Sequence, residues 1–167
     1  VKDECRRFGL KAFKALGASY AIYRFIRDEF GDHAVNANDF YTREYIAPGK
    51  YTFCTATDGN HGRGVAWVAK LLRQKAVIYM PANTVRARIE NSRSEGAEVI
   101  IVNGTYDDAV IRCSGDAEKN GWQIISDTSW QGYNRIPMWI MAGYLTMFRE
   151  VSEASNSWEP EIAIVQG

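Results

Sequence analysis

A lysine and two aspartates are the residues of this chain whose positions fit nucleophilic or proton-transfer chemistry. Lys14 falls in the first turns of an expected helix, where the positive end of the helix dipole disfavours a charged amine. It is a candidate nucleophile, although a solvated surface lysine is commoner at such a position, and Lys11 competes with it. Asp58 and Asp127 each follow an apolar run. Two acids that reach one cleft allow one to hold a proton while the other stays ionised.

Each of these candidates has a structural alternative. Asp58 and Asp127 also fit helix capping, Asp58 by satisfying N–H groups around residues 59–62 and Asp127 by capping the segment after it. His61 is more typical of a packed or hydrogen-bonded histidine than of a base. With two histidines and three cysteines that show no CxxC spacing or adjacent base, neither a metal site nor a thiol nucleophile is expected.

The stretch over residues 55–62, with sequence TATDGNHG, is the expected centre of the site. It follows an apolar run at residues 51–54 and precedes a helical pattern that includes Val65, Val68 and Leu72. A strand that runs through a glycine-flanked turn into a helix gathers backbone N–H donors at one point. The pattern therefore predicts an anion or cofactor site.

The rest of the chain alternates between strand-like and helix-like patterns. Apolar runs occur at residues 51–54, 76–80, 99–102, 122–125 and 162–165, and helical patterns cover 84–95, 106–120 and 133–154. Continuously apolar strands in successive βα units predict an α/β fold with three layers, in which helices cover both faces of a parallel sheet. Upstream, a helix is expected from about residue 10 to residue 23, and residues 24–50 read as an irregular connection.

Composition narrows the classes of partner. Twenty basic and twenty acidic residues cancel in 167, which gives no reason to expect nucleic acid or an anionic membrane surface as a partner. The sequence has no apolar run of about 18 residues, so membrane insertion is not expected. Cys5, Cys54 and Cys113 are an odd and widely spaced set that suits a reducing compartment, and the chain is predicted to be cytoplasmic.

Several segments resemble fold type II pyridoxal-phosphate enzymes, the tryptophan-synthase β group. The resemblance is closest to the diaminopropionate ammonia-lyase family, and it runs from end to end of the chain. The matching segments are Arg7-Phe8-Gly9-Leu10, Ala12-Phe13-Lys14, residues 57–64 with Val65-Ala66-Trp67, Val77-Ile78-Tyr79-Met80-Pro81, Tyr106-Asp107-Asp108, Asp127-Thr128, Trp130, Gly132-Tyr133, Ile136-Pro137 and Trp139-Ile140-Met141.

The resemblance implies roles for the candidate residues. Lys14 would form the Schiff base with pyridoxal 5′-phosphate, and Asn60 would hydrogen-bond the ring hydroxyl oxygen of the cofactor. Asp58 and Asp127 would be the catalytic carboxylates and, with Thr57, would bind the amino-acid substrate. Asp58 stands where related deaminases often carry a small hydroxyl residue. The implied reaction is α,β-elimination of 2,3-diaminopropionate to pyruvate and ammonia.

The resemblance also implies a division of the chain. Residues 1–50 would belong to the large cofactor-binding lobe, residues 51–154 to the small α/β lobe, and residues 155–167 to a linker and returning strand that stop before the phosphate-binding loop. Both ends look cut, and apolar surface left open is expected to produce a homodimer. Two alternatives stay open: a serine or threonine dehydratase of the same fold, and a non-catalytic α/β module that binds a ligand or a partner.

Overall fold

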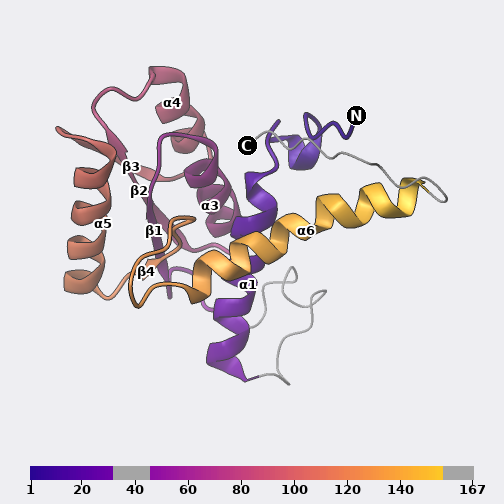
Figure 1. The fold of residues 1–167 in the computed structure, drawn as a ribbon. Helices are drawn as coiled ribbons and strands as arrows, with labels where there is room; N and C mark the ends of the chain where they lie inside the picture. The colour runs from indigo at the N-terminus through magenta and orange to yellow at the C-terminus, as the bar shows by residue number, and fades with distance from the viewer. Residues whose placement is uncertain (32–45, 156–167) are drawn as a thin grey trace.

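A computed structural model describes residues 1–31 and 46–155 as an α/β fold built on a four-stranded parallel sheet (Figure 1). The strand order is β3-β2-β1-β4, with β1 hydrogen-bonded to both β2 and β4. The elements, in chain order, are η1 (Arg7–Gly9), α1 (Lys14–Phe30), β1 (Thr52–Ala56), α3 (Asn60–Leu71), β2 (Lys75–Pro81), α4 (Arg86–Ser94), β3 (Glu98–Val102), α5 (Tyr106–Asn120), β4 (Gln123–Ile124) and α6 (Arg135–Ser155).

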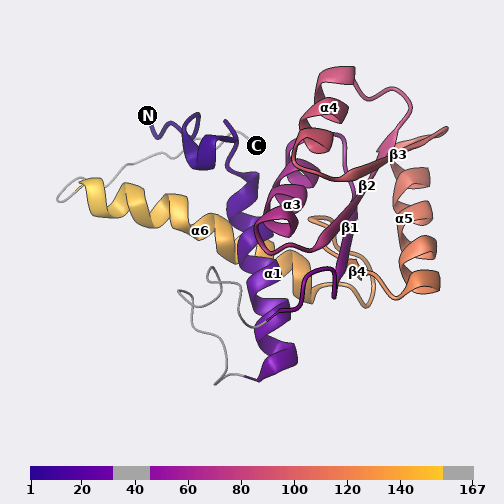
Figure 2. The ribbon, with the colours of Figure 1, turned by 180° about the vertical axis from the view of Figure 1, so that it is seen from behind.

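Helices cover both faces of the sheet, as the sequence predicted. Helix α5 lies on one face, and α3 and α4 lie on the other (Figures 1 and 2). Alternate residues of a strand supply the two cores: Phe53 and Ile78 pack on the α3 side, whereas Cys54 and Val77 pack on the α5 side. The edge strand β3 is only half-buried.

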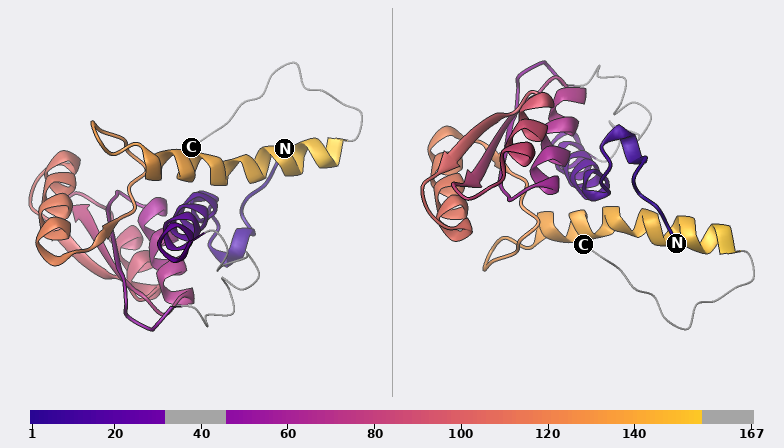
Figure 3. Two further views of the ribbon diagram at one scale, coloured as in Figure 1. Left: turned by 90° about the horizontal axis from the view of Figure 1, so that it is seen from below. Right: turned by 90° about the horizontal axis from the view of Figure 1, so that it is seen from above.

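Beyond α3, the helices α1 and α6 pack against each other and cross (Figure 3). Helix α1 contacts both α3 and α6, so it lies between the sheet layer and the long α6. Its buried residues include Ala18, Ile22 and Ile26, which belong to the same core as the α3 face of the sheet. The first residue of this helix is Lys14, so the packing of α1 fixes the lysine's position.

The predicted bounds of α1 are wrong at both ends. The helix begins at Lys14 and not near residue 10, because Phe8, Gly9 and Lys11 have positive φ angles of 52°, 73° and 55°, which interrupt a right-handed helix. At the other end the helix continues to Phe30, through seven residues that were expected to be irregular. Ile26 in that stretch is fully buried, and its packing outweighs the polar character around it.

The remaining predicted elements agree with the structure to within a few residues. The helix predicted over residues 106–120 has those bounds, and Gly121 ends it with a left-handed φ of 67°. The strand predicted over residues 162–165 lies outside the described residues. Within the described part of the chain, no helix combines the length and apolar character that a membrane span requires.

Candidate active site

Lys14 and Asp127 form the central contact of the site. Lys14 Nζ donates a hydrogen bond to Asp127 Oδ2 at 3.2 Å, and the two side chains are 28% and 24% exposed. Lys14 begins α1, where its charge opposes the helix dipole, and Asp127 follows β4 in the loop that leads to α6. The carboxylate compensates the ammonium group. The sequence identified both residues and had no means of pairing them.

Two helices, α3 and α6, pack against the start of α1 through glycines. A Cβ at Gly64 of α3 would lie 3.0 Å from the Ala15 Cα and 3.3 Å from the Lys14 carbonyl carbon, so α3 packs directly on the start of α1. A Cβ at Gly143 of α6 would lie 2.5 Å from the Leu16 carbonyl oxygen. Because both contacts are with backbone atoms, no side-chain rotation relieves them, and each glycine is required for the approach of its helix.

Two aromatic rings flank the Lys14 ammonium. Its nitrogen lies 5.7 Å from the Phe13 ring centroid and 5.5 Å from that of Tyr144, and the two rings meet edge to face. Both distances permit cation–π attraction. The Tyr144 hydroxyl is buried with no hydrogen-bond partner among the described residues, and burial, with Asp127 as the second cause, raises the pKa of Tyr144. The hydroxyl therefore stays protonated and is a donor.

His61 lies on the inner side of Asp127. It is 3% exposed, its Nε2 is 2.7 Å from the Ile125 carbonyl oxygen, and its Nδ1 is 3.8 Å from Asp127 Oδ2. Burial lowers the pKa of His61, and the Asp127 carboxylate opposes that shift. The prediction of a packed, hydrogen-bonded histidine is confirmed.

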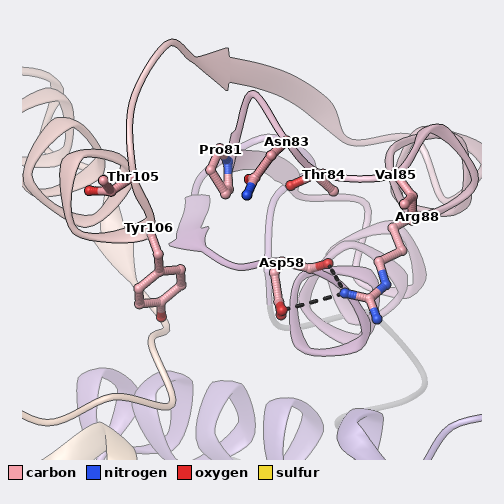
Figure 4. Close-up of a pocket in the computed structure, with 8 residues that line it drawn as sticks. All are labelled: Asp58, Pro81, Asn83, Thr84, Val85, Arg88, Thr105 and Tyr106. Carbon is pink, nitrogen blue, oxygen red and sulfur yellow. Dashed lines mark hydrogen bonds and ion pairs between the residues drawn. The ribbon is translucent and has the colours of Figure 1, made fainter.

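Asp58 takes no part in the Lys14–Asp127 contact and pairs with Arg88 instead. The Arg88 guanidinium donates to the Asp58 carbonyl oxygen at 2.9 Å and to Asp58 Oδ2 at 3.4 Å. The Asp58 side chain is 75% exposed and lines a pocket of about 500 Å³. Figure 4 shows this pocket with the residues that line it. The other lining residues are Pro81, Asn83, Thr84, Val85, Arg88, Thr105 and Tyr106.

Tyr106 connects the surroundings of the two aspartates. Its ring borders the pocket beside Asp58 (Figure 4), and its hydroxyl is 3.2 Å from Thr128 Oγ1, next in sequence to Asp127. Burial raises the pKa of Tyr106, and both Asp127 and Asp58 add to the shift. The two carboxylates thus act on the same tyrosine. They follow β1 and β4, which are neighbours in the sheet, as expected for a site at its carboxyl edge.

Neither aspartate caps a helix through its side chain. In the turn after β1, Thr57 is the residue that satisfies a backbone donor: its buried Oγ1 accepts from the Gly59 N–H at 3.0 Å. The start of α3 has no side-chain cap. Asn60, the first residue of α3, is exposed, and its side chain makes no hydrogen bond to another described residue. Capping as the alternative explanation of Asp58 and Asp127 is therefore wrong.

Comparison with known proteins assigns the family. The family model described as "Pyridoxal-phosphate dependent enzyme" matches residues 1–166. The chain belongs to this family.

Diaminopropionate ammonia-lyase of Escherichia coli K12 is 44% identical over 153 residues, which are 92% of this chain and 38% of that enzyme. A crystal structure of the E. coli enzyme in complex with an aminoacrylate–PLP azomethine reaction intermediate matches with a TM-score of 0.83 and 42% identity, over 95% of this chain and 40% of that one. L-threonine ammonia-lyase of Geobacter sulfurreducens is 33% identical over 88 residues, which are 53% of this chain and 21% of that enzyme. The resemblance stated from the sequence is confirmed, and the chain spans about 38% of the length of its E. coli relative.

The site's own residues fit the cofactor after which the pyridoxal-phosphate-dependent family is named. Lys14 supplies the amine to which an aldehyde cofactor can attach, and its nitrogen lies beside a carboxylate that can accept its proton. The uncapped N-terminus of α3 and the exposed Asn60 amide offer hydrogen-bond donors to an anionic or polar group.

Sequence reasoning assigned no role to two residues of this site. Arg88 lies on α4, and its pairing with Asp58 depends on the approach of α4 to the β1–α3 turn. Tyr144 lies on α6, where its ring packs beside Phe13 and Lys14. The glycines of that helix and of α1 were the available signal, because small residues at matching positions indicate close helix packing.

Proposed function

We propose that this chain carries the lysine, asparagine and aspartates of a pyridoxal-phosphate-dependent lyase that converts 2,3-diaminopropionate to pyruvate and ammonia by α,β-elimination. The 3.2 Å contact between Lys14 and Asp127 is the observation that carries the proposal. It joins an amine and an acid from elements 113 residues apart in the sequence. The likeness to diaminopropionate ammonia-lyase over 92% of the chain supports the choice of substrate.

Lys14 is the proposed attachment point of the cofactor and one of the bases that act at the substrate Cα. The cofactor, when bound, supplies an electron sink for the carbanion at Cα. Lys14 attacks as a neutral amine, so it first releases a proton. Asp127 is the nearest acceptor for that proton, because its Oδ2 already accepts a hydrogen bond from Lys14 Nζ.

The turn after β1 is the proposed binding segment for substrate and cofactor. Asn60 donates its exposed amide to the cofactor's ring hydroxyl oxygen. Thr57 shapes the turn through its bond to the Gly59 N–H, and this leaves the first N–H groups of α3 for the carboxylate of the amino acid. Asp58 is the second carboxylate. Its 75% exposure and long contact with Arg88 leave it able to reach a ligand.

In this proposal the two aspartates have different roles in proton transfer. Asp58, which borders the pocket, removes the Cα proton from one face, and Lys14 acts from the other, so that either Cα configuration can react. Asp127 binds the β-ammonium group of the substrate and is placed to protonate or hold the departing amine. Tyr106 lines the pocket with Asp58, and its hydroxyl contacts Thr128, the residue after Asp127, so it links the surroundings of the two carboxylates.

Elimination of ammonia from serine or threonine is the second candidate activity, supported by the likeness to L-threonine ammonia-lyase over 53% of the chain. Diaminopropionate is favoured because its leaving group is an amine, for which two carboxylates near the reacting centre are suitable partners. A non-catalytic α/β module is the remaining alternative. The presence of Lys14, Asp58, Asn60 and Asp127 together argues against it.

The proposal extends to organisation and assembly. We assign residues 1–50 to the large lobe, 51–154 to the small α/β lobe and 155–167 to a linker and returning strand. The dense packing of α1 against both α3 and α6 supports a firm junction between the first two parts.

A homodimer in a reducing, cytoplasmic compartment completes the proposal. Exposed apolar side chains on α6 and free thiols at all three cysteines support it, and light scattering after size exclusion tests the dimer.

The activity is tested by ammonia release from 2,3-diaminopropionate, serine and threonine in the presence of pyridoxal phosphate. Asp58→Asn is expected to reduce turnover of diaminopropionate by at least about 100-fold while cofactor attachment to Lys14 is kept. Asp28→Asn is the matched control, because Asp28 also pairs with an arginine, Arg135, at the far end of α1. Full activity in the Asp58 variant, or faster release from serine or threonine than from diaminopropionate, would refute the assignment.

A further inference from the structure

His61 has a buried nitrogen whose surroundings the proposed function leaves unexplained. The ring is 3% exposed, and Nδ1 has no hydrogen-bond partner among the described residues. A buried polar atom without a partner is costly, and the neighbouring carboxylate is close without being bonded. Asp127 Oδ2 lies 3.8 Å from Nδ1, beyond the range of about 2.7–3.2 Å for a hydrogen bond.

The other ring nitrogen fixes where the proton of His61 resides. Nε2 is 2.7 Å from the carbonyl oxygen of Ile125, and a carbonyl oxygen only accepts, so Nε2 carries the hydrogen. In the neutral ring, Nδ1 then presents a lone pair. That lone pair faces a carboxylate oxygen, which is a second acceptor. Two acceptors face each other, and a single proton placed between them would turn repulsion into a hydrogen bond.

The charge on Lys14 determines whether Asp127 and His61 take up a proton between them. While Lys14 is an ammonium group, it compensates Asp127 at 3.2 Å and the histidine remains neutral. Once the lysine becomes neutral, the partly buried carboxylate loses its counter-ion, and an uncompensated charge in such a place is expensive. Uptake of one proton by the carboxylate and imidazole removes that cost. The 3.8 Å gap then needs to close by about 1 Å to form a charge-assisted hydrogen bond.

We propose that His61 is a positioning residue that shares with Asp127 the proton released by Lys14. This rests on the proposed function, in which Lys14 reacts as a neutral amine. The proton leaves Lys14 Nζ, enters at Asp127 and is held between Oδ2 and Nδ1, so no proton passes to solvent and no charge is left unpaired. The Nε2 anchor on Ile125 keeps the ring from rotating away.

The surroundings of His61 are consistent with this role. Among the described residues, the groups that act on its protonation are the Asp127 carboxylate and the Lys14 ammonium, from the loop after β4 and from α1, together with the Ile125 carbonyl. Burial lowers the pKa of His61, Asp127 raises it and Lys14 lowers it. Loss of the lysine's charge therefore raises the proton affinity of the imidazole at the moment when the proton is released.

The test is a ¹⁵N NMR titration of the histidines in the protein without added cofactor. The chain contains two histidines, so His33→Gln leaves His61 as the single signal. At pH 8, His61 is expected as the Nε2–H tautomer with an unprotonated Nδ1. Lys14→Met is expected to raise its protonation midpoint by about 1 pH unit, and Asp127→Asn to lower it by a similar amount.

Matched controls separate the proposal from a general effect of charge. Lys11→Met removes an exposed lysine three positions from Lys14, and Asp116→Asn removes a carboxylate bound to Arg112 and Tyr79. Neither is expected to move the His61 midpoint. An Nδ1–H tautomer in the unsubstituted ring, or equal midpoints in all variants, would overturn the proposal. Since no cofactor takes part, this outcome is distinguishable from failure of the proposed function, which appears as absence of cofactor on Lys14.

Discussion

The crossing of α1 and α6 at Gly143 gives the sharpest prediction for packing around Lys14. A methyl group there would meet the Leu16 carbonyl oxygen at 2.5 Å and the Gly17 Cα at 2.8 Å. Non-bonded carbon and oxygen atoms approach no closer than about 3.3 Å even in C–H···O contacts. Gly143→Ala therefore forces the two helices apart by several tenths of an ångström, and the start of α1 moves with them.

Two terms set the size of the effect. Alanine is a better helix former than glycine by about 1 kcal/mol, which stabilises the variant. Overpacking against backbone atoms costs about 1–3 kcal/mol, which opposes that gain. Gly115→Ala on α5 isolates the first term, because nothing lies within 4 Å of a Cβ at that exposed position. The two variants are expected to differ by the overpacking term alone, about 1–3 kcal/mol, with Gly115→Ala the more stable.

Urea unfolding followed by circular dichroism measures the difference directly. The urea midpoint of Gly115→Ala is expected to lie above that of the wild type. The midpoint of Gly143→Ala is expected to lie below that of Gly115→Ala, with similar slopes for both variants. Gly143→Ala should also weaken attachment of pyridoxal phosphate to Lys14, whereas Gly115→Ala should leave it unchanged. Equal stability of the two variants would show that α1 and α6 are not in backbone contact, and the reasoning about how Lys14 is held would be wrong.

Two further predictions concern the elements around the site. Thr105→Ala should destabilise the chain by about 1 kcal/mol, because Thr105 and Asp108 form a reciprocal capping box at the start of α5; urea unfolding measures the loss, and Thr105→Ser should restore it. Hydrogen bonds from Arg7, and secondarily from Lys2, lower the pKa of Glu150 to about 2. The stabilisation is therefore present above the ordinary glutamate pKa of about 4.3 and is lost as pH falls from there toward 2. The stability difference between the wild type and Glu150→Gln should shrink over that interval and, because the pair is at the surface, also in high salt; a difference independent of pH contradicts this.

Local sequence signals predicted the elements that have local determinants. Helix α5 begins at a threonine cap and ends at Gly121, and both signals are visible in the sequence. The start of α1 depends on Lys11, whose backbone is in the left-handed region. A lysine in the sequence does not indicate that conformation. The continuation of the helix beyond Arg24 depends on burial of Ile26, which is a tertiary effect.

In the candidate site, too, local sequence signals predicted some features, whereas others required the assembled fold. The sequence placed Asp58 and Asp127 after strands because those strands are apolar, and the structure adds that β1 and β4 are neighbours. The order β3-β2-β1-β4 is not contained in the periodicity, so the pairing of Lys14 with Asp127 and of Asp58 with Arg88 required the assembled fold.

The most direct test of the account is borohydride reduction of the protein with pyridoxal phosphate, followed by peptide mass spectrometry. The account predicts one pyridoxyl group per chain, on the peptide that contains Lys14, and its loss in Lys14→Arg but not in Lys11→Arg. Labelling spread over several lysines, or labelling that is unchanged in Lys14→Arg, would contradict the claim that the amine beside Asp127 is the reactive one.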